Sequence, residues 1–232
     1  MTGRQVPAAC GRAAHRGERL RRIGSRASPA ALRTPSGILC ALTPHPAEAR
    51  NERDIWIMQL LYHTGIRREE CAFGVRGDFR KREDEWALRV IGKGEKERFV
   101  TVNSTLLDAL IRHRRNRGLP PMPSPGDSDP IVRAVARGNA IPLTPRQIGK
   151  ILERIAKQSS LDCEDGHMRE QLVAMSTHWL RHTNATHRLM AGASLETTQD
   201  ELGHGDPRTT RIYAQTLDAA RREDAEKLSK LS

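Results

Sequence analysis

The chain has 232 residues, a formal net charge of +11 and a mean hydropathy of −0.62. It contains no run of eighteen apolar residues, so a membrane span is not expected. Its four cysteines are widely spaced, which fits a reducing cytosol and argues against a zinc site or a disulfide framework. The excess of basic residues favours a polyanionic partner.

The positive charge is concentrated at the start of the chain. Residues 1–46 contain eight Arg, no Lys and one Glu, with many Gly, Ala and Pro and little apolar periodicity. This composition predicts a disordered basic arm, which is compatible with electrostatic contact to nucleic acid. Residues 47–232 carry 31 basic and 27 acidic residues, which indicates local positive patches rather than a uniformly basic surface.

The first predicted elements are two helices and a hairpin. A helix is expected over 47–63, with an apolar stripe formed by Ile55, Met58, Leu61 and Tyr62. It ends at Thr64-Gly65, and a second short helix then carries Arg67 and Glu70. Residues 86–91 and 98–102 are typical of two paired strands, with Gly92 and Gly94 at the turn.

A helix over 105–115, capped by Ser104, follows the hairpin. Its end holds a basic cluster made of Arg112, His113, Arg114, Arg115 and Arg117. This cluster is either a solvated helix end or a contact surface for a DNA backbone, and the sequence leaves both open.

The second half of the chain is predicted to be helical between loops. Five Pro in 119–130 indicate a loop, and Thr144-Pro145 begins a helix that runs to about 158. Residues 159–172 are polar and are predicted to form a loop. Further helices are expected over 176–191, from the Ser194 cap to Gly203, and over 217–231, where the last has a mixed apolar stripe.

Four polar residues in this half suit phosphate chemistry. His178 and Arg181 lie three residues apart and so share one face of a helix. Arg181 is a forked donor that matches phosphate oxygens, and His178 and His204 can hydrogen-bond an oxygen or move a proton. The Tyr213 hydroxyl can act as a nucleophile on a phosphoryl group held in line with it. Each feature alone is also common on solvated helix faces and at helix ends.

Taken in order, these residues resemble the C-terminal signature of tyrosine recombinases, the family of phage integrases and Xer-type resolvases. The matching segments are Thr177-His-Trp-Leu-Arg-His-Thr183, Leu202-Gly-His204 and Tyr213. Upstream, Thr64-Gly-Ile-Arg-Arg-Glu-Glu70 resembles the family's first arginine box, and Gly92-Lys-Gly-Glu-Lys-Glu-Arg98 resembles its lysine hairpin. The resemblance runs from about residue 47 to the end. It implies an α+β, mainly α, DNA breaking–rejoining catalytic fold with a small antiparallel sheet.

The resemblance also implies a mechanism without metal or nucleotide cofactor. Six side chains would act on one scissile phosphate: Arg67, Lys93, His178, Arg181, His204 and Tyr213. Tyr213 would attack to form a 3′-phosphotyrosyl link, and the two arginines would neutralise charge on the phosphoryl oxygens. Lys93, with Lys96 as the alternative, would protonate the leaving 5′ oxygen. Glu70 would support Arg67.

Double-stranded DNA is the predicted partner of this chain. The residues predicted to contact double-stranded DNA are Lys96, Arg98, Arg112, Arg114 and Arg115. The resemblance implies a cytoplasmic, nucleoid-associated enzyme that integrates or recombines DNA as part of a mobile element. It would act as a homo-tetramer on paired DNA sites, with 217–231 docking on a neighbouring protomer, and without a membrane.

The chain departs from the family pattern at two places. Relatives usually carry a helical core-binding domain before the catalytic domain, and 1–46 is too short for it, so that domain is expected to be missing or reduced. Cys71 and Gly74 stand where relatives usually have Leu, which predicts loose packing unless neighbours fill the space. Alternative functions are a truncated integrase remnant that only binds DNA, a type IB topoisomerase-like relaxing enzyme, and a plain basic helical interaction protein.

Overall fold

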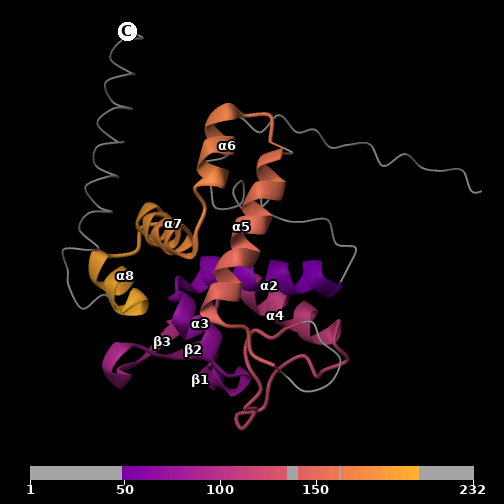
Figure 1. Ribbon diagram of the computed structural model, residues 1–232. Helices are drawn as coiled ribbons and strands as arrows, with labels where there is room; N and C mark the ends of the chain where they lie inside the picture. Colours follow the sequence, from indigo (N-terminus) through magenta and orange to yellow (C-terminus); the bar gives the residue numbers. More distant parts are fainter. Residues whose placement is uncertain (1–48, 135–140, 162, 204–232) are drawn as a thin grey trace, which may run out of the picture.

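The computed structural model describes residues 49–134, 141–161 and 163–203 (Figure 1). The predicted arm over 1–46 and the predicted helix over 217–231 lie outside these residues. The elements in chain order are α2 (Ala49–Thr64), α3 (Arg68–Phe73), η2 (Arg76–Asp78), β1 (Phe79–Arg82), β2 (Glu85–Ile91), η3 (Lys93–Glu95), β3 (Glu97–Thr101), α4 (Ser104–Arg115), α5 (Pro145–Leu161), α6 (Gly166–Val173), α7 (Thr177–Met190) and α8 (Leu195–Leu202). The predicted mainly helical fold with a small antiparallel sheet is confirmed.

The sheet has three antiparallel strands in the order β1-β2-β3. The two predicted strands are present as β2 and β3, and their register sets Val90 opposite Arg98. The sequence did not predict β1, because only Phe79 of its four residues is buried and the other three are exposed. Such a strand lacks the alternation of apolar and polar residues that marks a half-buried strand.

Helix α2 is the centre of the core. The four residues predicted on its apolar side, Ile55, Met58, Leu61 and Tyr62, are all buried. Residues 54–58 are buried in succession, so the buried surface extends beyond that side. The helix is covered on several faces because α4, α5 and α7 all pack against it, and α5 crosses it in Figure 1. The fully buried Asp54 within this run forms ion pairs with Arg53 and with Arg154 of α5. A buried carboxylate is tolerated because these guanidinium groups compensate its charge.

The loose packing predicted for α3 is not found. Cys71 is completely buried, and burial raises the pKa of its thiol to about 12. A Cβ atom placed on Gly74 would lie 2.6 Å from Cδ1 of Ile131. Ile131 therefore occupies the volume that a larger side chain at Gly74 would need, and the small residue is matched by its neighbour.

The predicted cap at Ser194 is confirmed, because its side chain accepts a hydrogen bond from Thr197 N. Ser176, predicted only as part of a helix, caps α7 in the same way by accepting from Trp179 N. Helix α4 is different, because Asn103 rather than Ser104 is its cap.

The predicted loop over 159–172 is wrong as well: α5 continues to Leu161, and α6 begins at Gly166. Helix α6 buries only Met168 and Leu172, which is too short an apolar pattern to stand out in sequence.

His113 makes the fold sensitive to acid. Its ring stacks on Trp56, with centroids 5.5 Å apart, and burial together with Arg76, Arg114 and Arg133 lowers its pKa to about 4. The unfolded chain takes up this proton near pH 6.5 and the folded chain does not, so the free energy of unfolding falls as pH drops from 6.5 to 4.

We expect His113→Phe, which keeps an aromatic ring against Trp56, to remove part of this acid sensitivity. The recovered free energy of unfolding at pH 4 is on the order of 2 to 3 kcal/mol. Urea denaturation at pH 7, 5.5 and 4 measures it, with the exposed His167→Phe as control. Equal acid sensitivity of His113→Phe and the parent chain would contradict the assignment.

Candidate active site

The end of α2 turns sharply at Gly65. Gly65 has φ +61°, and its N–H donates to Leu61 O at 2.9 Å. A Cβ atom at this position would lie 2.5 Å from Cδ2 of Leu202 and 2.8 Å from Oδ1 of Asn184. Only glycine fits both the left-handed conformation and the close approach of these two side chains. The turn therefore directs the chain from α2 to Arg67. At Gly65 the backbone packs closely against α7 and α8.

A polar face of α7 satisfies the carbonyl groups at the end of α2. Asn184 Nδ2 donates to Tyr62 O at 2.7 Å and to His63 O at 3.2 Å. Arg188 Nε donates in turn to Asn184 Oδ1 at 3.1 Å. The last carbonyls of a helix have no partner within the helix, so buried ones need donors from elsewhere. Here α7 supplies them and fixes α2 against α7.

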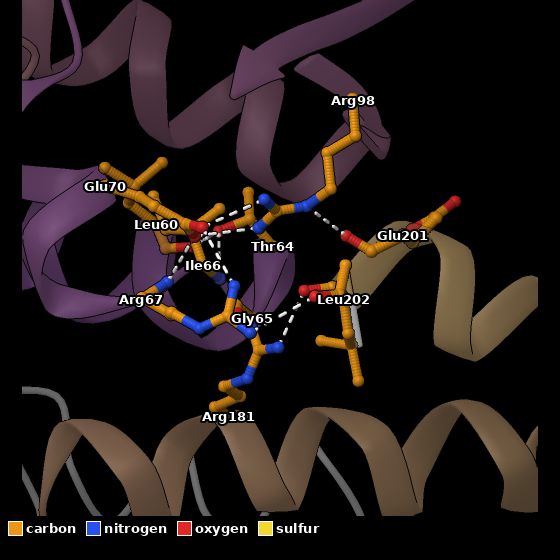
Figure 2. A network of polar contacts seen from close by, with 11 residues as sticks. Leu60, Thr64, Gly65, Ile66, Arg67, Glu70, Arg98, Arg181, Glu201 and Leu202 are labelled. Atoms are coloured by element: carbon orange, nitrogen blue, oxygen red, sulfur yellow. Dashed lines mark hydrogen bonds and ion pairs between the residues drawn. The ribbon is translucent and has the colours of Figure 1, made fainter. Parts of the chain in front are cut away.

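Arg181 is part of the same face and links three segments. Its Nη1 donates to Gly65 O at 2.5 Å and its Nη2 to Leu202 O at 2.6 Å. The residue is only 5% exposed. One guanidinium thus joins α7, the turn after α2 and the end of α8 (Figure 2).

Arg67 lies at the N-cap position of α3, directly after that turn. Its Nη2 donates to Gly203 O at 3.1 Å and its Nη1 to Glu70 Oε1 at 3.0 Å. Its side chain is 39% exposed, so this guanidinium is accessible to a ligand. Arg67 and Arg181 donate to the carbonyls of consecutive residues, and Figure 2 shows their guanidinium groups close together. Two adjacent forked donors of this kind suit a phosphate group.

Glu70 balances the charge of the arginines. Its carboxylate accepts from the Arg67 backbone N at 2.7 Å and from both terminal nitrogens of Arg98, at 2.9 and 2.7 Å. Burial by itself raises the pKa of Glu70, but the hydrogen bonds and charges of Arg98 and Arg67 outweigh it and lower the pKa. With Arg181, the group contains three cations and one anion. The surplus positive charge favours an anionic ligand.

The remaining predicted catalytic residues are described only in part. His178 lies in the first turn of α7, one turn before Arg181, and is exposed. Lys93 begins η3 in the turn between β2 and β3, and its side chain lies outside the described part of the structure. His204 and Tyr213 also lie outside it. Among the predicted site residues, the structure brings Arg67, Glu70 and Arg181 together with Arg98, which was predicted as a DNA contact.

The five residues predicted to contact DNA fall into two groups. Lys96, Arg112 and Arg115 are exposed. Arg98 and Arg114 are directed into the protein, which corrects their assignment as surface contacts. Arg114 is buried, and it donates to Pro120 O at 2.7 Å and to Met122 O at 3.2 Å. Arg98 is held by Glu70, as described above.

Three further residues take part in these polar contacts and were not predicted from the sequence: Asn184, Arg188 and Glu201. Asn184 follows Arg181 after three residues and Arg188 follows Asn184 after four, so their common helical face was a usable signal. Glu201 had no such signal. Its carboxylate accepts from Thr101 Oγ1 at 3.1 Å and forms an ion pair with Arg188 at 2.5 Å, which joins α7, α8 and β3.

No helix among the described residues combines the length and the apolar character that a membrane span requires. The same residues also contain no group of three or more His, Cys, Asp or Glu side chains arranged to hold a metal ion.

The fold and the arginine-lined site define a catalytic domain of the tyrosine recombinase type. The chain belongs to the phage integrase family, whose model, described as "Phage integrase family", matches residues 38–220. The family expected from the motifs is thus confirmed.

Several curated proteins are similar to this chain. Tyrosine recombinase XerC of Actinobacillus pleuropneumoniae is 31% identical over 198 residues, covering 82% of this chain and 58% of that protein. XerC of Corynebacterium efficiens is 35% identical over 161 residues, covering 69% and 46%. XerD of Listeria monocytogenes is 32% identical over 161 residues, covering 69% and 49%. The chain spans about half the length of the curated relatives it matches.

Solved structures show the same fold. The XerH site-specific recombinase in a post-cleavage complex with its difH substrate matches with a TM-score of 0.61 and 24% identity, over 83% of this chain and 50% of that chain. The XerA recombinase matches with a TM-score of 0.58 and 23% identity, over 82% and 62%. The Tn1549 transposon integrase in complex with circular intermediate DNA gives 0.57 and 20%, over 78% and 59%.

The Glu70 network yields a prediction about stability. Glu70→Gln leaves the buried Arg98 without its counter-ion, so we expect the free energy of unfolding at pH 7 to fall by about 3 kcal/mol. Because the folded-state pKa of Glu70 is lowered, its stabilisation is complete above its usual value of 4.5 and disappears as pH falls through the folded-state value. The difference between the two proteins should therefore shrink in acid.

Denaturant titration at pH 7 and at several pH values below 4.5 measures this difference. Glu69→Gln is the matched control, because the neighbouring Glu69 side chain is 55% exposed and should change stability little. A loss from Glu70→Gln that is small, or that stays constant in acid, would contradict the described role of the carboxylate.

Proposed function

We propose that the chain cleaves and rejoins DNA strands through a covalent 3′-phosphotyrosyl intermediate, and so carries out site-specific recombination or integration. The observation that carries this proposal is the pairing of Arg67 and Arg181 at the carbonyls of Gly203 and Leu202, directly before His204. Membership of the phage integrase family supports it, and so do relatives named tyrosine recombinases.

In the proposed reaction the scissile phosphate binds to Arg67 and Arg181. Their forked donors neutralise the negative charge that spreads over the non-bridging oxygens in the transition state. Loss of one preorganised donor of this kind typically costs about 2.7 to 4 kcal/mol in transition-state stabilisation. His204, which follows directly on the carbonyls that both arginines bind, hydrogen-bonds a phosphate oxygen or Tyr213.

Tyr213 attacks the phosphorus in line, and the bond to the 5′ oxygen breaks. The ordinary pKa of a tyrosine hydroxyl is near 10, so a base must accept its proton at neutral pH. His178 accepts this proton. Lys93, or Lys96 in its place, donates a proton to the departing 5′ oxygen. The phosphotyrosyl link conserves the phosphodiester energy, so a second 5′ hydroxyl can reseal the strand without ATP and without a metal or other cofactor.

The proposal includes double-stranded DNA as partner and a homo-tetramer on paired sites. Four strand exchanges are needed to recombine two duplexes, which requires four active sites, and the predicted helix over 217–231 would join neighbouring protomers. Lys96, Arg112 and Arg115 are exposed basic residues that can contact the DNA backbone. The corresponding place of action is the nucleoid within the cytoplasm.

The nucleophile is tested by trapping the covalent intermediate. Nicked duplexes taken from DNA that flanks the coding sequence should give a protein–DNA band that survives SDS, because the released fragment diffuses away before it can reseal the strand. Tyr213→Phe, which removes the attacking oxygen, should lose the band completely.

Tyr62→Phe is the matched control, since the chain has only two tyrosines. Tyr62 is 4% exposed and its hydroxyl is hydrogen-bonded with His187 Nδ1 at 2.9 Å, so this variant should keep the band. A band that persists in Tyr213→Phe would show that another group attacks the DNA. Relaxation of a supercoiled plasmid without paired sites would instead indicate topoisomerase-like action.

Binding to the duplex should depend strongly on salt. Neutralised phosphates release counterions, so four or more contacts predict at least a roughly 100-fold loss of affinity between 50 and 200 mM salt. Fluorescence anisotropy with a labelled duplex measures the slope. Arg112→Ala should make the slope shallower by about one contact, and a flat response in the parent chain would contradict phosphate-dominated binding.

A further inference from the structure

Every nitrogen of the Arg98 guanidinium has a partner inside the protein. Its two terminal nitrogens bind the two oxygens of Glu70 in parallel, at 2.9 and 2.7 Å. Its Nε donates to Glu201 O at 2.9 Å. The side chain is only 12% exposed. A surface arginine that contacts a DNA phosphate would instead present its forked end to solvent.

The partners of Arg98 lie in two segments next to proposed catalytic residues. Glu70 binds the backbone and side chain of Arg67. Glu201 directly precedes Leu202 and Gly203, whose carbonyls bind Arg181 and Arg67. Arg98 therefore contacts the end of α8, which precedes His204 in the sequence, and the carboxylate that supports Arg67.

The lysine hairpin is the third segment. Arg98 is on β3, which leads out of the turn that carries Lys93. At the base of this turn Gly92 N donates to Lys96 O at 2.8 Å. A Cβ atom on Gly92 would lie 3.4 Å from Nη1 of Arg98, and one on Gly203 would lie 3.0 Å from its Cδ and Nε. The side chain of Arg98 is thus packed between the hairpin base and the end of α8.

We propose that Arg98 is a positioning residue that fixes the Lys93 hairpin, Arg67 and the end of α8 at Gly203 relative to one another. The inference rests on the proposed strand-cleavage function for its catalytic consequence. The geometry of Arg98 is independent of that function. Its planar guanidinium makes three hydrogen bonds that hold segments 67–70, 92–98 and 201–203 together.

Lysine cannot reproduce these contacts. The three donors of an ammonium group are on one nitrogen and lack the planar fork, so it cannot replace Nε, Nη1 and Nη2 at their separate positions against Glu201 O and the two oxygens of Glu70. Arg98→Lys keeps the charge that a phosphate contact needs and loses the geometry that positioning needs. This substitution therefore separates the two roles more sharply than Arg98→Ala does.

The main experiment compares Arg98→Lys and Arg98→Ala with the parent chain on nicked duplex. The measured quantities are the rate of covalent-complex formation at saturating protein, the duplex affinity and its salt slope. Because a displacement of about 1 Å costs roughly 100-fold in rate, we expect both variants to be slowed at least that much. Affinity and salt slope should stay within about twofold of the parent values.

Arg89 provides a matched control on the neighbouring strand. Its guanidinium binds Asp78 at 2.8 Å and is 25% exposed, so it is also a partly buried arginine paired with a carboxylate. The pairs Arg89–Phe99 and Val90–Arg98 are consecutive in the register, which puts Arg89 and Arg98 on opposite faces of the sheet. Arg89→Lys should leave the rate of covalent-complex formation unchanged.

A second measurement does not depend on activity. Amide hydrogen exchange at Gly92 and Gly203, whose N–H groups bind Lys96 O and Asp200 O, should accelerate at least tenfold in Arg98→Lys and not in Arg89→Lys. If the parent chain forms no covalent complex, the strand-cleavage proposal fails and exchange alone decides the role of Arg98.

Two outcomes would overturn the positioning role. In the first, Arg98→Lys reacts as fast as the parent chain at saturation while Arg98→Ala has a shallower salt slope, which indicates a phosphate contact. In the second, exchange at Gly92 and Gly203 is unchanged in both Arg98 variants. Slow reaction of Arg98→Lys together with faster exchange at these two amides supports the proposal.

Discussion

Three consecutive carbonyl groups at the end of α8 each accept a hydrogen bond from a different arginine. Arg98 binds Glu201 O, Arg181 binds Leu202 O and Arg67 binds Gly203 O. The C-terminal carbonyls of a helix have no partner within it and carry the negative end of its dipole, so they attract cations. The arginines come from β3, α7 and the turn before α3. The end of α8 therefore gathers three distant segments at one point.

This arrangement requires charge compensation, and Glu70 provides it. Guanidinium groups this close repel one another, and a buried one is costly without a counter-charge. Glu70 is 5% exposed and binds two of the three arginines. Its negative charge reduces the positive charge of the three arginines without cancelling it. A phosphodiester would complete the balance. The same carboxylate thus serves the stability of the fold and the preference for an anionic ligand.

The sequence predicted those parts of the site that depend on local order. The helix ends at Gly65, Ser194 and Gly203 have caps or turns with a direct chemical signal, and the structure has them. Burial set by distant partners was not predictable. Arg98 binds a carboxylate 28 residues away in the sequence. The apolar residues predicted on one side of α2 did not indicate that the helix lies at the centre of the core. A basic residue looks the same in sequence whether its partner is solvent, DNA or Glu70.

The geometry also explains why folding and binding can use the same arginines. A guanidinium has five N–H donors in a rigid fork, so hydrogen bonds to a carbonyl or carboxylate on one edge are compatible with a phosphate on another. Arg67 has this combination, with its bonds to Glu70 and Gly203 and a side chain that is 39% exposed. Because these internal bonds hold the fork in place before any ligand arrives, phosphate binding need not order it. Donors fixed in this way are the ones most effective at stabilising a transition state.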